Sequence, residues 1–297
     1  METANSRADG CDGGWAPRAG YVDTEAMRFH YLEWGSAGPP VVLWHGVTSD
    51  AHTWWRVGPA LAAQNYHVFA LDLPGHGHSD DSPDGYNVDV TAALLDGALA
   101  ALGLRQPTIV GHSWGGMNAL VHATGGPRRV PGATYALIDP ALRLGDDPAR
   151  YTKHYLHGLG VPPDDRGRAE IAAANPEWDP CDVAWRVEAR YRARPAAVAG
   201  FFEHNPGREV TAALGELRMP TLLMLADEAV GGIVPSHMLP HVEAVVSSSV
   251  TWLVMEGAGH SIHRDTFERF SETLIGFLHY NVPRGDLRDK PALSDPG

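Results

Sequence analysis

The 297-residue chain has little cysteine, an excess of acidic over basic residues and no long apolar run. Only Cys11 and Cys181 are present, so we expect neither a disulfide framework nor a cysteine-based zinc site. The 23 basic residues are outnumbered by 36 acidic ones, and the net charge of -13 argues against a nucleic-acid partner. No apolar stretch reaches the ~18 residues needed to cross a bilayer, so we expect no membrane partner either.

The composition is otherwise typical of a folded globular protein, with 44% hydrophobic and 20% charged residues. The N-terminus lacks the basic and apolar segments of a signal peptide, which predicts a cytoplasmic location. Residues 1–19 show no periodicity, and residues 283–297 are polar and contain proline, so both ends are predicted to be flexible.

Between the two ends, short apolar runs alternate with helical patterns. An antiparallel strand is expected at 27–34, with 21–23 as a possible partner. Helical faces recur at 90–102, with Asn87 or Asp89 as the cap, and at 267–278. This alternation predicts an α/β fold with a mostly parallel, doubly wound sheet. The buried strands are expected at 41–45, 67–73, 108–111, 134–139, 221–226 and 250–255.

One segment interrupts this alternation. Residues 144–209 contain no apolar strand and are rich in arginine, alanine, proline and aromatic residues. We therefore expect a helical lid over 144–209, inserted after the sixth strand, while 20–143 and 210–282 form the core.

The most informative motif surrounds Ser113. The run Gly111-His-Ser-Trp-Gly115 follows a predicted strand and opens a predicted helix. Small residues two positions before and after the serine permit the strained turn of a nucleophile elbow, which exposes the hydroxyl above the sheet. The alternative is a glycine-rich turn whose serine only caps the helix.

Three further segments occur in a consistent order around this elbow: Trp44-His-Gly-Val47, Asp72-Leu-Pro-Gly-His-Gly-His-Ser79 and Gly257-Ala-Gly-His260. Together the four segments resemble the α/β-hydrolase-fold superfamily over nearly the whole ordered chain. The resemblance implies a serine hydrolase in which Ser113 is the nucleophile and His260 the base. It also implies an oxyanion hole formed by the backbone amides of Val47 and Trp114.

The acid of the triad departs from the family pattern. In the stretch 225–235, Leu-Ala-Asp-Glu-Ala-Val-Gly-Gly-Ile-Val-Pro, the usual acid position falls on Ala229. Asp227 is a nearby carboxylate, and Asp139 ends the strand that follows the elbow helix. Because the usual position is vacant, we prefer Asp139 and keep Asp227 as the alternative.

A serine at the elbow favours acyl transfer to water, whereas haloalkane dehalogenases and epoxide hydrolases of this fold use an aspartate there. We expect hydrolysis of an ester or lactone bond in a small apolar or aromatic substrate, with no cofactor and no metal. Trp54, Trp178 and Trp185 could line the substrate pocket or pack the lid onto the core. The alternatives are a carbon–carbon bond hydrolase, a cofactor-independent oxygenase and a non-catalytic small-molecule binding protein.

Overall fold

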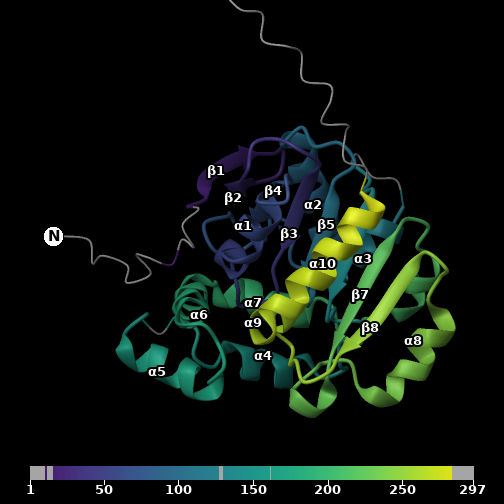
Figure 1. Cartoon of the computed structure of the whole chain (residues 1–297). Helices are drawn as coiled ribbons and strands as arrows, with labels where there is room; N and C mark the ends of the chain where they lie inside the picture. Colours follow the sequence, from purple (N-terminus) through teal and green to yellow (C-terminus); the bar gives the residue numbers. More distant parts are fainter. Residues whose placement is uncertain (1–10, 12–15, 127–129, 161, 283–297) are drawn as a thin grey trace, which may run out of the picture.

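The computed structural model describes residue 11 and residues 16–126, 130–160 and 162–282. Eight strands form one sheet in the order β1-β2-β4-β3-β5-β6-β7-β8 (Figure 1). Strand β2 pairs with β1 and β4 in antiparallel fashion, and every other pairing is parallel. The strands are β1 (Arg18–Asp23), β2 (Arg28–Trp34), β3 (Pro40–Trp44), β4 (His67–Leu71), β5 (Thr108–His112), β6 (Thr134–Ile138), β7 (Thr221–Ala226) and β8 (Val250–Met255).

Helices cover both faces of the sheet, because the parallel strands are apolar on both sides. Along β3, Val42 and Trp44 face the core under α2, α3 and α8, while Val41 and Leu43 face the core under α1 and α10. The predicted doubly wound α/β fold is therefore confirmed. The helices are α1 (Val57–Ala62), α2 (Val88–Ala101), α3 (Trp114–Thr124), α4 (Pro148–Leu156), α5 (Asp165–Ala174), α6 (Pro180–Arg192), α7 (Pro195–Glu203), α8 (Leu239–Val245), α9 (Ile262–Asp265) and α10 (Phe267–Asn281).

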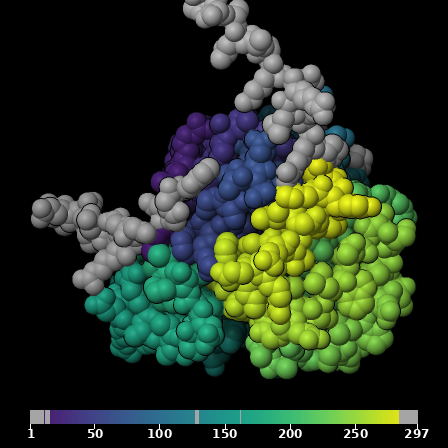
Figure 2. All heavy atoms as spheres, in the orientation of Figure 1, coloured from purple at the N-terminus to yellow at the C-terminus, as the bar shows by residue number. Residues whose placement is uncertain are grey.

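Four helices, α4 to α7, follow β6 and lie together at one end of the sheet (Figure 1). Local signals start three of them, since the side chains of Asp147, Asp164 and Asp179 cap the first turns of α4, α5 and α6. In the space-filling view this insertion forms a lobe against the rest of the molecule (Figure 2). We refer to it below as the lid.

Polar contacts attach the lid to the core. The indole of Trp55 donates to Asp182 of α6 at 2.9 Å, and the indole of Trp178 donates to Asp265 at 2.6 Å. Arg192 of α6 lies 3.6 Å from the buried carboxylate of Asp50. The contacts of Asp182 and Arg192 hold α6 against the segment that follows β3, and the contact of Trp178 holds the lid against α9.

Two expectations about the N-terminal region were wrong. Cys11 and Cys181 form a disulfide, which links the N-terminal segment to the start of α6. The pair was misjudged because a separation of 170 residues in sequence says nothing about distance in the fold. Arg18 and Ala19 belong to β1 rather than to a flexible end. The remaining terminal predictions, for 1–10, 12–15 and 283–297, lie outside the described residues.

Within the described ranges, no helix has the length and apolarity to cross a membrane. The cytoplasmic location expected from the N-terminus stays a prediction. The disulfide counts against it, because such bonds persist mainly in oxidising compartments.

Candidate active site

Ser113 occupies the sharp turn between β5 and α3. Its backbone adopts φ 54° and ψ -114°, a conformation that few non-glycine residues tolerate. Close packing maintains this turn, because a Cβ on Gly115 would lie 2.3 Å from the carbonyl oxygen of Trp44. The serine amide donates to the carbonyl of Ile138 at the end of β6. The sequence motif therefore adopts the strained elbow geometry and presents Ser113 at the end of the sheet where β5 finishes.

Asp139 follows β6 and is fully buried. Its Oδ2 accepts hydrogen bonds from His260 Nδ1 at 2.7 Å and from the amide of Ile233 at 3.1 Å. Its Oδ1 accepts the amide of Ala226 at 3.1 Å. Three donors thus surround the carboxylate, and the hydrogen bond to Nδ1 orients the imidazole of His260.

Asp227, the alternative acid, lies elsewhere. Its carboxylate accepts the backbone amides of Gly257 and Ala229, both at 2.9 Å, and among the described residues no hydrogen bond or ion pair joins it to His260. These two hydrogen bonds lower the pKa of Asp227 below its usual value. Its position supports the loop that carries the histidine rather than the histidine itself.

His260 lies on the loop between β8 and α9. The centre of the His112 ring lies 4.6 Å from the centre of the His260 ring, with the two planes tilted by 41°, and His112 Nε2 donates to the carbonyl oxygen of His260 at 2.8 Å. His260 and Ser113 border the same cavity, yet within the described ranges no hydrogen bond joins them. In unliganded hydrolases this contact is often long and shortens when substrate binds.

The loop after β3 approaches the elbow closely. A Cβ on Gly46 would lie 3.0 Å from the Cβ of Ser113, so glycine permits this approach. The amides of Val47 and Trp114 have no hydrogen-bond acceptor among the described residues. Two unpaired amides beside a nucleophile are the arrangement that an oxyanion hole requires.

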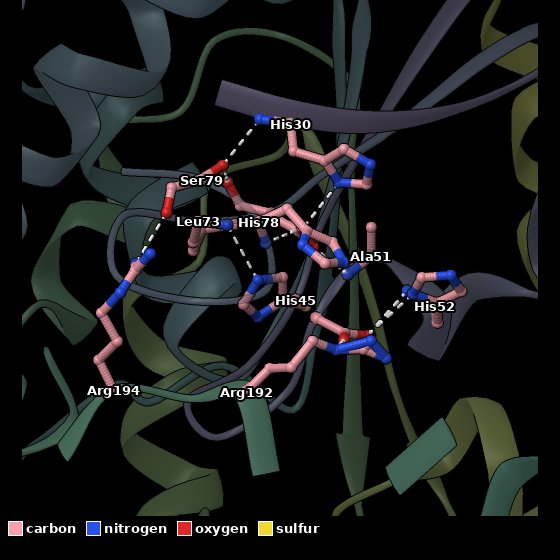
Figure 3. A network of polar contacts seen from close by, with 11 residues as sticks. His30, His45, Ala51, His52, Leu73, His78, Ser79, Arg192 and Arg194 are labelled. Carbon is pink, nitrogen blue, oxygen red and sulfur yellow. Dashed lines mark hydrogen bonds and ion pairs between the residues drawn. The ribbon is translucent and has the colours of Figure 1, made fainter. Parts of the chain in front are cut away.

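A buried polar network supports this loop (Figure 3). Asp72 accepts the amides of Ala51 and His78 and the Nδ1 of His30, at 2.6, 2.9 and 2.7 Å. His45 Nδ1 donates to a neighbouring carbonyl, while its Nε2 accepts the amide of Leu73 at 2.9 Å. These hydrogen bonds hold the loop in one conformation. An oxyanion hole needs such preorganisation, because its donors must be in place when the negative charge develops.

Most other histidines near the site are held neutral by burial. Burial lowers the pKa of His76 to about 3, and it lowers the pKa of His45, His112 and His263 as well. Each of these rings makes a hydrogen bond within the fold. No group of three or more His, Cys, Asp or Glu side chains in the described part of the chain is arranged to hold a metal.

Two cavities meet at Ser113. The first, which we call the aromatic chamber, has a volume of about 390 Å³ and is lined mainly by Leu142, Tyr151, Tyr155, Phe201, Phe202 and Val242. The second, the arginine chamber, has a volume of about 310 Å³ and is lined by His260, Trp178, Asn175 and three arginines, Arg186, Arg190 and Arg264. Val47, Ser113 and Tyr155 border both.

The tryptophans expected at the pocket have different positions. Trp178 borders the arginine chamber. Trp54 is fully buried against the ring of His263, and Trp185 stacks on His52 at 4.1 Å, so neither borders either chamber. Trp114 supplies its amide to the site, while its indole is buried against Phe201.

Several residues of the site were not anticipated from the sequence. They are Arg186 and Arg190 in the lid, Arg264 after the histidine loop, and His112, which holds the carbonyl of His260. The sequence contained one signal for His112, its place directly before Ser113. No local pattern in the sequence indicates that the arginines belong to the site, because Arg186 and Arg190 lie 73 and 77 residues after Ser113.

Known proteins share this architecture. A family model described as alpha/beta hydrolase fold matches residues 39–159. N-formylmaleamate deformylase of Pseudomonas putida is 27% identical over 88% of this chain and 96% of its own. The dihydrolipoyllysine-residue acetyltransferase component of an acetoin cleaving system, also from Pseudomonas putida, is 30% identical over 89% of this chain and 70% of its own.

Among solved structures, E-2-(acetamidomethylene)succinate hydrolase has a TM-score of 0.76 at 20% identity, covering 89% of this chain and 99% of its own. This likeness concerns the fold alone. The relatives of this chain include hydrolases, and the chain belongs to the α/β-hydrolase-fold family.

Proposed function

We propose that the protein is a serine hydrolase that cleaves an ester or lactone bond of a small substrate with an apolar or aromatic acyl group. The observation that carries this proposal is the hydrogen bond of 2.7 Å between His260 and the buried Asp139, beside a serine at a strained elbow. Nucleophile, base and orienting acid are the three groups that acyl transfer requires.

In this mechanism Ser113 Oγ attacks the carbonyl carbon while His260 Nε2 takes its proton. The amides of Val47 and Trp114 stabilise the oxyanion of the tetrahedral intermediate. His260 then gives the proton to the leaving group, and an acyl-enzyme forms on Ser113. Water attacks this ester with His260 again as base, and the returning proton restores the serine. The carboxylate of Asp139 accepts the Nδ1 proton of His260 and stabilises the imidazolium.

The aromatic chamber supports the assignment of the acyl group. Phe201 and Phe202 are buried, and Tyr155 stacks on Phe202 at 4.8 Å, so the wall is rigid and apolar. An acyl chain or ring would gain free energy there by leaving water. A charged acyl group would lose hydration against these rings, and Arg143, the arginine that borders the chamber, already lies beside Glu209.

A second candidate is hydrolysis of a carbon–nitrogen bond of the amide type. It is favoured by the similarity to N-formylmaleamate deformylase over almost the full length of both chains. The same triad serves both reactions, and the difference lies in the leaving group that His260 must protonate. Parallel assays with esters, lactones, amides and vinylogous diketones distinguish these reactions from carbon–carbon cleavage.

The first experiment is treatment of the wild type and Ser113→Ala with a fluorophosphonate, followed by intact mass measurement. We expect one adduct on the wild type and none on Ser113→Ala. Turnover that survives Ser113→Ala but is lost in His260→Ala would instead indicate an oxygenase-type use of the histidine. Tight ligand binding without any adduct or turnover would indicate a binding protein.

A further inference from the structure

Cationic side chains are concentrated beside the proposed nucleophile. Three arginines border the arginine chamber, and no aspartate or glutamate of the described residues borders it. An adjoining open groove on the lid, the basic groove, is lined by Arg150, Lys153, His154 and His157, and in the part of the chain that the structure describes no acidic residue lines it. In a chain with 36 acidic and 23 basic residues, this concentration of basic side chains around two adjacent cavities departs from the average composition.

Arg186 of α6 borders both the arginine chamber and the basic groove. Its guanidinium donates to the carbonyl oxygen of Thr48 at 2.7 Å, and within the described ranges no carboxylate lies within ion-pair distance of it. Arg264, by contrast, lies 3.7 Å from the buried carboxylate of Asp182 and donates to Thr53. Arg186 is therefore a cation of the chamber that lacks a counter-ion.

The surroundings of Arg186 destabilise its charged guanidinium, which has no carboxylate partner among the described residues. Burial and the nearby charges of Arg264 and Arg190 lower the pKa of Arg186 to about 9. The guanidinium still carries its charge at neutral pH, but it is destabilised there. An anion in the chamber would relieve the repulsion and form charge-assisted hydrogen bonds.

The aromatic chamber differs in this respect. Arg143 borders it, but this side chain is 60% exposed and lies 3.9 Å from the carboxylate of Glu209, which neutralises its charge. The two chambers therefore offer opposite environments on the two sides of Ser113. One suits an apolar group, and the other suits a negative charge.

The position of His260 assigns each chamber to one part of the substrate. His260 borders the arginine chamber and not the aromatic chamber. Because His260 must protonate the leaving group, the leaving group has to lie on the side of the histidine. The acyl group then occupies the aromatic chamber.

We propose that the substrate carries a carboxylate on its leaving group and that Arg186, assisted by Arg190, binds this carboxylate in the arginine chamber. This inference rests on the proposed serine hydrolase function and narrows its substrate class. The basic groove would attract such anions to the chamber, against the negative charge of the molecule as a whole.

The test compares three esters. Carboxymethyl butanoate carries a carboxylate on the leaving group, carbamoylmethyl butanoate is its neutral counterpart of similar size, and monobutyl succinate carries the carboxylate on the acyl side. Each kcat/KM is divided by the rate of alkaline hydrolysis of the same ester. We expect this corrected kcat/KM to be roughly 10- to 100-fold higher for carboxymethyl butanoate than for carbamoylmethyl butanoate. A difference of this size corresponds to one or two hydrogen bonds to a charged group. Monobutyl succinate should be the poorest of the three.

Variants distinguish recognition of the anion from a structural role. Arg186→Gln should bring the ratio of corrected kcat/KM between the anionic and the neutral butanoate ester close to one. Arg186→Lys, which keeps the charge, should retain part of the preference for the anionic ester. The matched control is Arg166→Gln, which removes an exposed lid arginine paired with Glu170 and should leave the ratio unchanged. If Arg186 only holds the carbonyl of Thr48, Arg186→Gln will slow both esters equally, and the inference is wrong.

Failure of the inference and failure of the proposed function give different results. If the wild type hydrolyses the neutral ester at least as well as the anionic one, the proposed function stands and the inference about the carboxylate is wrong. If no ester is turned over, calorimetry of Ser113→Ala measures the binding affinity for the same two esters and tests the carboxylate site without turnover. Tighter binding of the anionic ester, lost with the added Arg186→Gln, supports the carboxylate site, and equal or absent binding refutes it.

Discussion

Replacing Asp139 with asparagine tests the proposed triad most directly. The carboxylate accepts the amides of Ala226 and Ile233 on different oxygens, and His260 Nδ1 on one of them. In either orientation, the amide group of asparagine therefore places an NH₂ against a backbone N–H. An unsatisfied buried donor costs about 1–3 kcal/mol, and the free energy of unfolding should fall by about that amount.

The effect on catalysis should be larger. Asparagine cannot neutralise the imidazolium of His260, and one of its orientations imposes the wrong tautomer. Loss of the buried acid in such triads lowers kcat by about 10⁴, equivalent to roughly 5.5 kcal/mol of transition-state stabilisation. For Asp139→Asn we expect a decrease of about 10³ to 10⁴ in kcat with little change in KM, measured on the neutral butanoate ester.

Asp227→Asn is the matched control for this substitution. Asp227 also accepts two backbone amides, those of Ala229 and Gly257, but no hydrogen bond or ion pair within the described ranges joins it to His260. We expect Asp227→Asn to lower kcat less than 10-fold. A larger loss for Asp227→Asn than for Asp139→Asn, with both variants folded by circular dichroism, would refute the assignment of the acid.

Three further predictions concern the fold around the site. Gly115→Ala should prevent fluorophosphonate labelling and lower Tm, because its Cβ would lie 2.3 Å from a carbonyl oxygen; Gly97→Ala, with open space around its Cβ, should do neither. Because the pKa of His76 is about 3 in the folded state and ~6.5 when unfolded, the unfolded state gains a proton first as pH falls below ~6.5. At pH 5 this residue alone should lower the free energy of unfolding by about 2 kcal/mol, and a flat urea stability profile between pH 7 and 5 would contradict this. Cys181→Ser should lower the free energy of unfolding by about 2–5 kcal/mol, and reductant should destabilise the wild type but not this variant.

Local patterns in the sequence were sufficient for much of the fold. The strands at 221–226 and 250–255 were predicted with the bounds that the structure has, and Asn87 caps α2 as expected. The elbow was also predicted from its residues, because two glycines and a serine form a short local pattern, although the contact of Gly115 with Trp44 that maintains the turn is tertiary. Apolar runs and glycine spacing act over short distances, so the sequence displays them directly.

Tertiary structure decided the contacts between distant segments. Asp139 and Asp227 both follow strands of the sheet, and only the path of the loop after β8 brings His260 to one of them. In the same way, 170 residues separate the cysteines that form the disulfide, which the sequence did not suggest.

The charge around the site likewise could not be predicted from the sequence alone. The sequence determined a net charge of -13 and a serine at an elbow, and both are properties of composition or of neighbouring residues. The cluster of arginines beside that serine depends on where the lid docks, through contacts such as Arg186 with Thr48, 138 residues apart. A total charge contains no information on position, whereas a binding site depends on which charges the fold brings together and which it leaves without a partner.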